Sequence, residues 1–405
     1  MKTLTAFNHR NYRLWFIGQL ISLFGTWMQS TAQGFLVYEL TRSPAQLGIV
    51  SFAGGLPIWL FMLYGGVVAD RMSKRSLLLR VQMALMAFAF ILSALVFMGV
   101  VRPWHIIVLA FLSGVAIAFE APTRQAMVSE MVCKEDIGNA IALNSTMFNT
   151  ASVIGPAVGG ITYSVYGPGW CFLLNGFSFL AIIVSLMMMT NMGEGNGRKN
   201  KEKVWSELME GFAYVAREPL VRTTMIAITV MSLFGLSYVT IFPSWAAEYL
   251  HGDARTAGYM HSFRGAGAVA GALSIAFMGR ISNRGRLFQM SSLIFPIVLI
   301  FFALTDNVHL SMFWLILVGG SSMFMLNMAN SMIQCTVPDR LRGRVMSVYS
   351  LTFFGMMPVG GLLIGSLSDL MGERISIIAC GTLVVLTALS LQFMGKIFKE
   401  TVKES

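Results

Sequence analysis

The chain is poor in charge. Only 12% of its 405 residues are Asp, Glu, Lys or Arg, whereas 56% are hydrophobic. Soluble proteins carry about 25% charged residues, and a soluble core cannot absorb this much apolar surface. The composition therefore excludes an ordinary soluble globular protein and indicates an integral membrane protein.

Cysteine is also scarce, and the residues that assemble catalytic centres are missing. The four cysteines, Cys133, Cys171, Cys335 and Cys380, show no paired spacing. This pattern implies neither a disulfide framework nor a zinc site. The segments between the apolar runs contain no phosphate-binding loop, nucleophile and base, or metal cluster, so we expect no enzyme, no cofactor and no metal.

Long apolar runs fill most of the chain. Twelve of them reach about 20 residues or more, the length at which an α-helix crosses roughly 30 Å of hydrocarbon. They do not alternate apolar and polar residues as the strands of a membrane barrel do. We predict an all-α integral membrane protein with twelve transmembrane helices, at 12–38, 45–69, 76–100, 104–128, 138–163, 169–190, 222–247, 256–279, 286–305, 309–334, 343–368 and 374–396.

Basic residues are distributed unevenly between the two sides of these spans. With the N-terminus inside, the inside segments hold 24 of the 29 Lys and Arg residues, and the outside loops hold Arg42, Arg102, Arg255 and Arg374. This asymmetry predicts that both termini are cytoplasmic. The net charge of +10 is then a topology signal, since no nucleic-acid-binding motif accompanies it. The first apolar run lacks a small-residue cleavage site and is predicted to remain as a helix.

The two halves of the chain repeat each other. An offset of 205 residues pairs Val132 with Val337, Gly138 with Gly343, Gly155 with Gly360, Gly160 with Gly365 and Gly167 with Gly372. At a slightly larger offset, segment 71–75 matches segment 280–284. We predict two pseudo-symmetric six-helix bundles, at 1–190 and at 222–405 including a cytoplasmic tail. The cytoplasmic linker at 191–221 is expected to contain an amphipathic surface helix.

One burst of charge lies between the second and third apolar runs. It reads Gly65-Gly66-Val67-Val68-Ala69-Asp70-Arg71-Met72-Ser73-Lys74-Arg75. This segment resembles the cytoplasmic loop signature of the major facilitator superfamily of secondary transporters, in which a Gly-rich helix end precedes Asp-Arg and further basic residues. Ser73 stands where the superfamily usually has a second Gly, so we expect Ser73 to make the turn.

Several other segments are similar to one branch of this superfamily, which contains the enterobactin exporter and macrolide efflux proteins. They are Asn11-Tyr12-Arg13-Leu14-Trp15, Thr41-Arg42-Ser43-Pro44, Trp205-Ser206-Glu207-Leu208-Met209-Glu210-Gly211 and Val337-Pro338-Asp339-Arg340-Leu341-Arg342-Gly343-Arg344. The resemblance spans most of the chain and implies a central cavity lined by the first, fourth, seventh and tenth helices. It does not imply a substrate, because members of this branch carry chemically unrelated cargo.

The fourth apolar segment contains two ionisable residues, Glu120 and Arg124. They are four residues apart and share one helical face, so they could neutralise each other. We interpret Glu120 as the proton-coupling residue, because burial and a nearby cation act oppositely on its protonation. A static ion pair is the alternative. The resemblance implies that Arg124 forms an inward gate with the signature residues Gly66, Asp70, Arg71 and Arg75.

Polar residues recur at helical spacing in three segments that the resemblance places around the cavity. They are Gln19, Ser22, Thr26, Gln29 and Gln33 in the first, Ser237, Thr240 and Ser244 in the seventh, and Asn327, Asn330 and Gln334 in the tenth. We predict that Gln29, Gln33, Ser237, Thr240, Asn327 and Asn330 contact the substrate. The alternative is that these side chains only hydrogen-bond to neighbouring helices.

Arg264 lies inside the eighth segment and must face protein or water. It is predicted to hold an anionic group of the substrate, such as a carboxylate or a catecholate. Pairing with Glu248 or with an amide across the bundle is the alternative.

Gly and Pro cluster in the fifth and eleventh segments. Gly155-Pro156-Ala157-Val158-Gly159-Gly160 resembles the antiporter signature of drug-exporting members, although that pattern begins with Gly where Ala151 stands. Pro frees a backbone carbonyl and bends a helix, and small residues allow close helix approach. We therefore predict bending at Gly155, Pro156, Gly160, Pro358 and Gly361.

These observations favour a secondary active transporter, a proton-coupled exporter of a small amphipathic molecule that is siderophore-like or drug-like, working by alternating access. An importer or lipid flippase of the same fold, or a non-transporting membrane receptor, is the alternative. The expected partners are the small-molecule substrate, protons and the lipid bilayer, and no nucleic acid. We expect a monomer in the bacterial plasma (inner) membrane.

Overall fold

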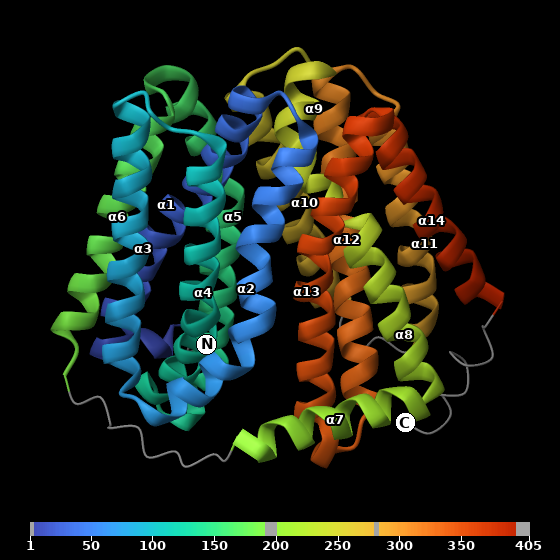
Figure 1. The fold of residues 1–405 in the computed structure, drawn as a ribbon. Helices are drawn as coiled ribbons and strands as arrows, with labels where there is room; N and C mark the ends of the chain where they lie inside the picture. Colours follow the sequence, from blue (N-terminus) through green and yellow to red (C-terminus); the bar gives the residue numbers. More distant parts are fainter. Residues whose placement is uncertain (1–3, 191–200, 279–282, 394–405) are drawn as a thin grey trace. The chain divides into compact units, whose positions relative to one another are not determined.

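Each predicted span of the first half coincides with one long helix. The computed structural model describes residues 4–190, 201–278 and 283–393. Two short 3-10 turns, η1 (Thr5–Asn8) and η2 (Lys134–Asp136), accompany the long helices. These are α1 (Arg10–Thr41), α2 (Pro44–Arg71), α3 (Lys74–Phe97), α4 (Pro103–Met131), α5 (Ile137–Tyr166) and α6 (Pro168–Met188) (Figure 1).

The second half repeats this arrangement after the linker helix α7 (Lys201–Arg217). Its long helices are α10 (Ala254–Phe277), α11 (Arg284–Ala303), α12 (Val308–Thr336), α13 (Asp339–Met371) and α14 (Glu373–Phe393). The span predicted at 222–247 is not one regular helix. A π-helical turn, η3 (Met231–Gly235), and a 3-10 turn, η4 (Ser237–Ile241), separate α8 (Pro219–Val230) from α9 (Phe242–Glu248). Pro243 in the first turn of α9 has no N–H to continue a regular ladder, which accounts for part of this break.

Proline and glycine set many of the helix ends. The helices α2, α4, α6 and α8 all begin at a proline, which suits the first helical position because its missing N–H would be unpaired there. Helices α5 and α13 end at Gly167 and Gly372, whose φ angles of 91° and 84° favour glycine. These two glycines are one of the pairs of the internal repeat.

The described helices have the length and surface of membrane spans. Nine spans within the described residues are long and apolar enough to cross a membrane. The helices α1, α5 and α10 have 32, 30 and 24 residues, which is long enough, but their sequences are less apolar than those of the nine spans. Large apolar side chains such as Phe177, Val184 and Leu386 are exposed on the outer surface. Contact of this apolar surface with water is unfavourable, whereas lipid acyl chains would cover it.

The chain forms two compact units, each with its own packing. Unit 1 comprises Met1–Arg42, Ala53–Lys201 and Gly252–Ser262, and unit 2 comprises Ser43–Phe52, Glu202–His251 and Phe263–Ser405. In unit 1, α1 packs against α5 and α6, and α3 packs against α4 and α6. In unit 2, α11 packs against α12 and α14, and α13 packs against α14, η3 and η4. Each unit thus includes a short segment of the opposite half, and the boundaries predicted at 190 and 222 remain predictions.

In unit 1, the segment that opens α10 packs against α5 through glycine. A Cβ added to Gly160 would lie 2.4 Å from the carbonyl oxygen of Ala254, and one added to Gly258 would lie 2.4 Å from that of Pro156. Side-chain carbons do not approach a backbone oxygen this closely. Only glycine therefore permits this backbone-to-backbone contact at either position.

Unit 2 repeats this contact where α2 begins. A Cβ on Gly365 of α13 would lie 2.5 Å from the carbonyl oxygen of Pro44, and one on Gly48 would lie 2.6 Å from that of Gly361. Gly160 and Gly365 are the same repeat pair that the 205-residue offset identifies. The repeat therefore preserves a specific packing geometry as well as a pattern of residues.

A serine and an aspartate reinforce each of these two contacts. Ser164 of α5 donates to Asp253 at 2.8 Å, and Asp253 also accepts from the first backbone N–H groups of α10. In unit 2, Ser43 donates to Asp369 of α13 at 2.7 Å, and Asp369 accepts from the N–H of Ala45 in α2. In unit 1 the aspartate, Asp253, directly precedes the helix that it caps, α10. In unit 2 the aspartate, Asp369, lies on α13, the helix against which α2 packs. Either arrangement places negative charge at a helix N-terminus, where it is stabilising.

The linker helix α7 packs against the beginning of α13 within unit 2. Arg344 forms an ion pair with Glu210, and Arg340 lies 3.6 Å from the same carboxylate. Gly211 lets the two helices touch, because a Cβ there would lie 2.9 Å from the carbonyl oxygen of Arg344. The predicted helix in the linker is present, while residues 191–200 lie outside the described part of the chain.

Candidate functional site

Glu120 and Arg124 form the ion pair that their spacing predicts. Both project from α4, and Nη1 of Arg124 lies 3.3 Å from Oε1 of Glu120. The Glu120 side chain is 12% exposed and that of Arg124 is 30% exposed. The carboxylate is therefore largely removed from solvent beside a more accessible cation. The ion pair neutralises a carboxylate that would be costly inside a membrane helix on its own.

Glycine brings α2 close to α4 just before this pair. A Cβ on Gly65 would lie 2.4 Å from the carbonyl oxygen of Ala118, whereas one on Gly66 would meet nothing within 4 Å. Gly65 therefore packs closely against α4, whereas Gly66, a residue of the predicted gate, has free space where a side chain would be.

The remaining gate residues are described in part. The side chains of Asp70 and Arg71 lie outside the described residues, so their predicted contact with Arg124 stays a prediction. Arg75 donates from Nη2 to the carbonyl oxygen of Met187 at 2.7 Å, near the end of α6. A cation at this position satisfies a terminal helix carbonyl and suits the negative end of the helix dipole.

Sequence reasoning missed the partner of Lys74. Its ammonium group pairs with Glu130 in the last turn of α4. Ser73 accepts a hydrogen bond from the N–H of Ser76 and so caps α3, which agrees with the expected turn at Ser73. The separation of Lys74 and Glu130 along the chain gives no local signal of this ion pair.

Arg264 lies among buried groups of unit 2. Its guanidinium interacts electrostatically with the hydroxyl of Tyr238, which belongs to η4 and is 1% exposed. Neither Nε of Arg264 nor the Tyr238 hydroxyl makes a hydrogen bond of good geometry within the described residues. Buried polar atoms without partners are rare in proteins and suggest a role with water, an ion or a ligand.

Some predicted polar residues of α1 are buried, and one hydrogen-bonds to a neighbouring helix. Gln19 and Ser22 are 4% and 2% exposed. Gln29 accepts a hydrogen bond of 2.7 Å from the side chain of Asn175 on α6. Gln33 is half-buried. Gln29 therefore makes the hydrogen bond to a neighbouring helix that was the alternative to substrate contact. This bond uses the side-chain oxygen of Gln29 and leaves its NH₂ group as a possible substrate donor.

The polar residues of the seventh span lie against α13. A Cβ on Gly360 would lie 2.9 Å from Cβ of Ser237, and one on Gly361 would lie 2.8 Å from Oγ1 of Thr240. Ser237 is 1% exposed. Both side chains thus occupy a tight helix contact, and their predicted role in binding substrate stays a prediction.

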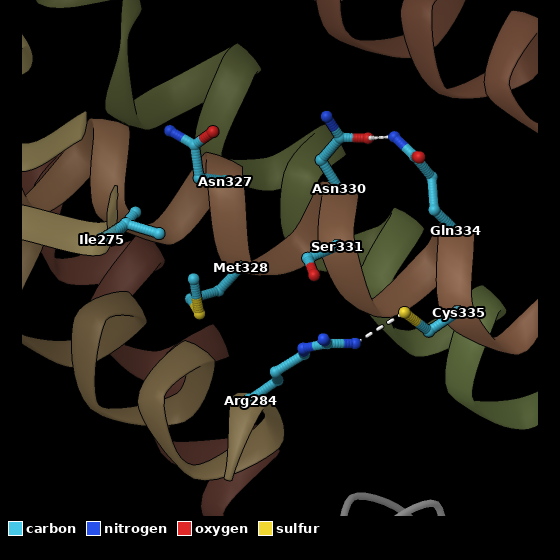
Figure 2. A pocket seen from close by; sticks show the side chains of 8 residues that line it. All are labelled: Ile275, Arg284, Asn327, Met328, Asn330, Ser331, Gln334 and Cys335. Carbon is cyan, nitrogen blue, oxygen red and sulfur yellow. Dashed lines mark hydrogen bonds between the residues drawn. The ribbon is translucent and has the colours of Figure 1, made fainter. Parts of the chain in front are cut away.

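The tenth span contributes to a cavity of about 360 Å³ in unit 2. Asn327 and Asn330, both predicted substrate contacts, line it together with Gln334 from the same polar stripe. Figure 2 shows Arg284 reaching from α11 toward Cys335 of α12, to which it donates a hydrogen bond. The remaining lining residues are Ile275, Met328 and Ser331. The volume lies within the roughly 300–1,000 Å³ that is usual for small-molecule sites.

The predicted bending residues lie within continuous helices. Pro156 is inside α5 and Pro358 is inside α13. Gly155 packs against α1, because a Cβ there would lie 2.6 Å from Cβ of Trp27. Gly160 and Gly361 permit the close contacts described above. Their packing role is therefore visible, and bending at these positions stays a prediction.

Comparison with known proteins places this arrangement in a family. Three relatives cover nearly all of the chain. The staphyloferrin A transporter of Staphylococcus aureus is 24% identical, with 97% of this chain and 98% of that protein covered. Macrolide efflux protein A of Streptococcus pyogenes is 21% identical, with 97% of each chain covered. The enterobactin exporter EntS of Shigella flexneri is 23% identical, with 92% of this chain and 88% of that protein covered.

Solved structures share the fold. A bacterial homologue of the human lysosomal transporter Spinster matches with a TM-score of 0.76 and 14% identity, over 97% of this chain and 98% of the other. A mutant of the nucleoside transporter NupG matches with a TM-score of 0.78 and 13% identity, over 95% of this chain and 99% of the other. The family model described as transmembrane secretion effector matches residues 1–403. The chain is a multi-pass membrane protein and belongs to this transmembrane secretion effector family of major facilitator superfamily transporters.

Proposed function

We propose that the protein is a proton-coupled exporter of a small amphipathic molecule, siderophore-like or drug-like, that works by alternating access in the bacterial inner membrane. The observation that carries the proposal is the similarity over nearly the whole chain to a macrolide efflux protein and an enterobactin exporter. Two chemically different cargoes among the relatives favour amphipathic molecules in general over one narrow substrate.

Proton coupling is supported by the Glu120–Arg124 pair. A carboxylate inside a membrane helix is costly unless it is neutralised by a partner or by a proton. Arg124 neutralises Glu120 in this arrangement at 3.3 Å. We propose Glu120 as the residue that carries the coupled proton when the two groups separate during the transport cycle.

Cargo binding is supported by polar groups in both halves. Nε of Arg264 and the hydroxyl of Tyr238 make no well-formed hydrogen bond within the described residues, and a cation beside a hydroxyl suits an anionic or catecholate-like group. Gln33 of α1 is half-buried and remains a candidate from the first half.

We place both termini in the cytoplasm, because the basic residues favour the inside segments. The exporter would act as a monomer, with no role for nucleic acid.

Gradient-driven uptake into proteoliposomes tests this function. The purified protein is reconstituted, an acidic lumen is imposed, and accumulation of a macrolide, a catecholate siderophore and a cationic dye is followed. An antiporter accumulates its cargo in the acidic lumen and loses this accumulation when an ionophore dissipates the gradient. Equal accumulation with and without the gradient would contradict proton coupling and favour a uniporter or a lipid flippase.

A further inference from the structure

The internal repeat makes the cavity of unit 2 the counterpart of an ion pair in unit 1. Lys74 and Arg75 open α3, and their repeat counterparts at the larger offset are Asn283 and Arg284, at the start of α11. Glu130 ends α4, and the 205-residue offset makes Cys335 its counterpart at the end of α12. Each offset thus pairs one helix end of unit 1 with one helix end of unit 2.

In unit 1 the charges at this position are neutralised. Lys74 pairs with the carboxylate of Glu130, and Arg75 donates to the carbonyl oxygen of Met187. The first turn of α3 is capped by the hydroxyl of Ser73. The cations and the helix start thus already have partners supplied by the protein.

In unit 2 both charges of this ion pair are absent, because Asn283 replaces Lys74 and Cys335 replaces Glu130. The remaining cation, Arg284, donates to the sulfur of Cys335, which is a weak acceptor. No carboxylate in the described part of the chain forms an ion pair with Arg284. The N-cap residue of α11, Asn283, makes no side-chain capping hydrogen bond. Within the described residues, the Arg284 cation and the start of α11 therefore lie together without a carboxylate partner.

The cavity beside Arg284 supplies the space and the donors for such a partner. Gln334 donates to Oδ1 of Asn330 at 2.8 Å, so the oxygen of that amide already has a partner. Nδ2 of Asn330 makes no hydrogen bond within the described residues and remains a donor in the wall of the cavity (Figure 2). Guanidinium and amide N–H groups match the oxygens of a carboxylate or phosphate group.

We propose that this cavity binds a small oxyanion, a carboxylate or phosphate group, which pairs with the guanidinium of Arg284. Arg284 is its principal ligand, Asn330 donates a second hydrogen bond, and the start of α11 adds a favourable dipole. The oxyanion comes from a soluble metabolite or from the headgroup of an anionic lipid. This inference does not depend on the proposed transport activity, because it concerns equilibrium binding.

Protection of Cys335 from a thiol reagent tests the proposal. The full-length protein with Cys133→Ser leaves Cys335 as the exposed thiol, since Cys171 and Cys380 are buried. Neutral N-ethylmaleimide is added in uncharged detergent with phosphate or citrate, at ionic strength matched with chloride. At an oxyanion concentration about ten times its dissociation constant, labelling is expected to slow roughly tenfold, because only a small fraction of sites remains empty. Chloride should have little effect.

Two arginine variants distinguish a specific anion-binding site from nonspecific electrostatic screening by salt. Arg284→Gln should abolish protection, whereas Arg286→Gln, which removes an exposed cation of the same helix outside the cavity, should keep it. Thermal unfolding gives an independent readout. Citrate or phosphate should raise the midpoint of the parent and of Cys335→Ser, and should not raise that of Cys335→Glu, where the new carboxylate occupies Arg284. Equal protection by chloride, equal loss in both Arg variants, or an unchanged response of Cys335→Glu would each overturn the proposal.

Nanodiscs identify the source of the oxyanion. If a lipid headgroup occupies the site, labelling will be slow in phosphatidylglycerol nanodiscs, fast in phosphatidylcholine nanodiscs, and insensitive to phosphate in the former. If a soluble anion occupies it, phosphate and citrate will protect Cys335 equally in both. Fast labelling in both lipids that neither anion slows would overturn the proposal.

Discussion

Glu120 carries a largely buried carboxylate beside a cation. Its side chain is 12% exposed, and Nη1 of Arg124 lies 3.3 Å from its Oε1. The ion pair neutralises a carboxylate that would be costly inside a membrane helix on its own. We propose that this carboxylate carries the coupled proton, which an amide of the same shape cannot do.

We expect Glu120→Gln to separate cargo exchange from proton-driven transport. The variant should lose accumulation driven by a pH gradient and should keep counterflow of labelled against unlabelled cargo, because counterflow needs binding and conformational change without net proton movement. Glu135→Gln is the control, since Glu135 is an exposed acid outside the membrane-spanning helices. If Glu120→Gln accumulates cargo as well as the parent does, Glu120 is a static ion partner.

Among the elements, the contacts of α5 with α10 and of α13 with α2 depend on the absence of single side chains. The nearest atoms to an added Cβ at Gly160 and Gly365 are backbone oxygens at 2.4 and 2.5 Å, which cannot move without moving a helix. Gly160→Ala and Gly365→Ala should therefore each destabilise the protein by about 1–3 kcal/mol, the usual cost of overpacking. Thermal unfolding in detergent measures this change.

Gly138→Ala provides the matched control in the same helix α5. An added Cβ at Gly138 meets nothing within 4 Å, so only helix propensity changes. This substitution should leave stability unchanged or raise it by up to about 1 kcal/mol. Unfolding midpoints of Gly160→Ala and Gly365→Ala that equal the parent's would show that these helices do not pack as described.

The contact near the start of α10 should also depend on pH. Partial burial of Asp253 opposes its ionisation. Hydrogen bonds from Ser164 and from the backbone N–H of Thr256, with the nearby charge of Arg255, outweigh this effect and leave the pKa of Asp253 below its usual value. A lowered folded-state pKa gives stability that is complete above the unfolded pKa of about 3.9 and is lost as pH falls through the folded value.

Ser164→Ala should move this loss of stability to higher pH, because it removes a hydrogen bond that favours the carboxylate. Unfolding midpoints measured between about pH 3 and pH 6 would reveal the shift. Ser145→Ala is the control, since Ser145 is on the same helix and, among the described residues, its hydroxyl bonds to the carbonyl of Ile141 in its own helix. Identical pH profiles for the parent and for Ser164→Ala would refute the role of this hydrogen bond.

The sequence predicts the helices of this fold better than it predicts their contacts. Apolar runs and prolines determine where helices lie, so the predicted spans of the first half coincide with observed helices. The break at η3 and η4 could not be predicted because an uninterrupted apolar run looks the same in a regular helix. The pair Lys74–Glu130, the bond between Gln29 and Asn175, and the cavity at Arg284 all join residues that are distant in the chain. Only tertiary packing brings them together.

For the whole molecule, the distribution of basic residues determines the orientation that we propose. Cys133 follows α4 and Cys335 lies in the last turn of α12, and both are exposed. Each follows an even number of predicted spans, so both should lie on the cytoplasmic side with the N-terminus. A membrane-impermeant maleimide should therefore label both residues in inside-out vesicles and neither in intact cells. Labelling of either cysteine in intact cells would contradict the orientation.

The central claim, that cargo movement is coupled to protons through Glu120, is tested most directly by proton flux. Proteoliposomes containing a pH-sensitive dye, with no imposed gradient, receive a cargo whose binding to the purified protein has been measured. We expect the cargo to move inward while protons leave, so that the lumen becomes alkaline with the parent and with Glu135→Gln, and does not with Glu120→Gln. No proton movement with a cargo that enters the vesicles, or equal movement in the parent and Glu120→Gln, would contradict it.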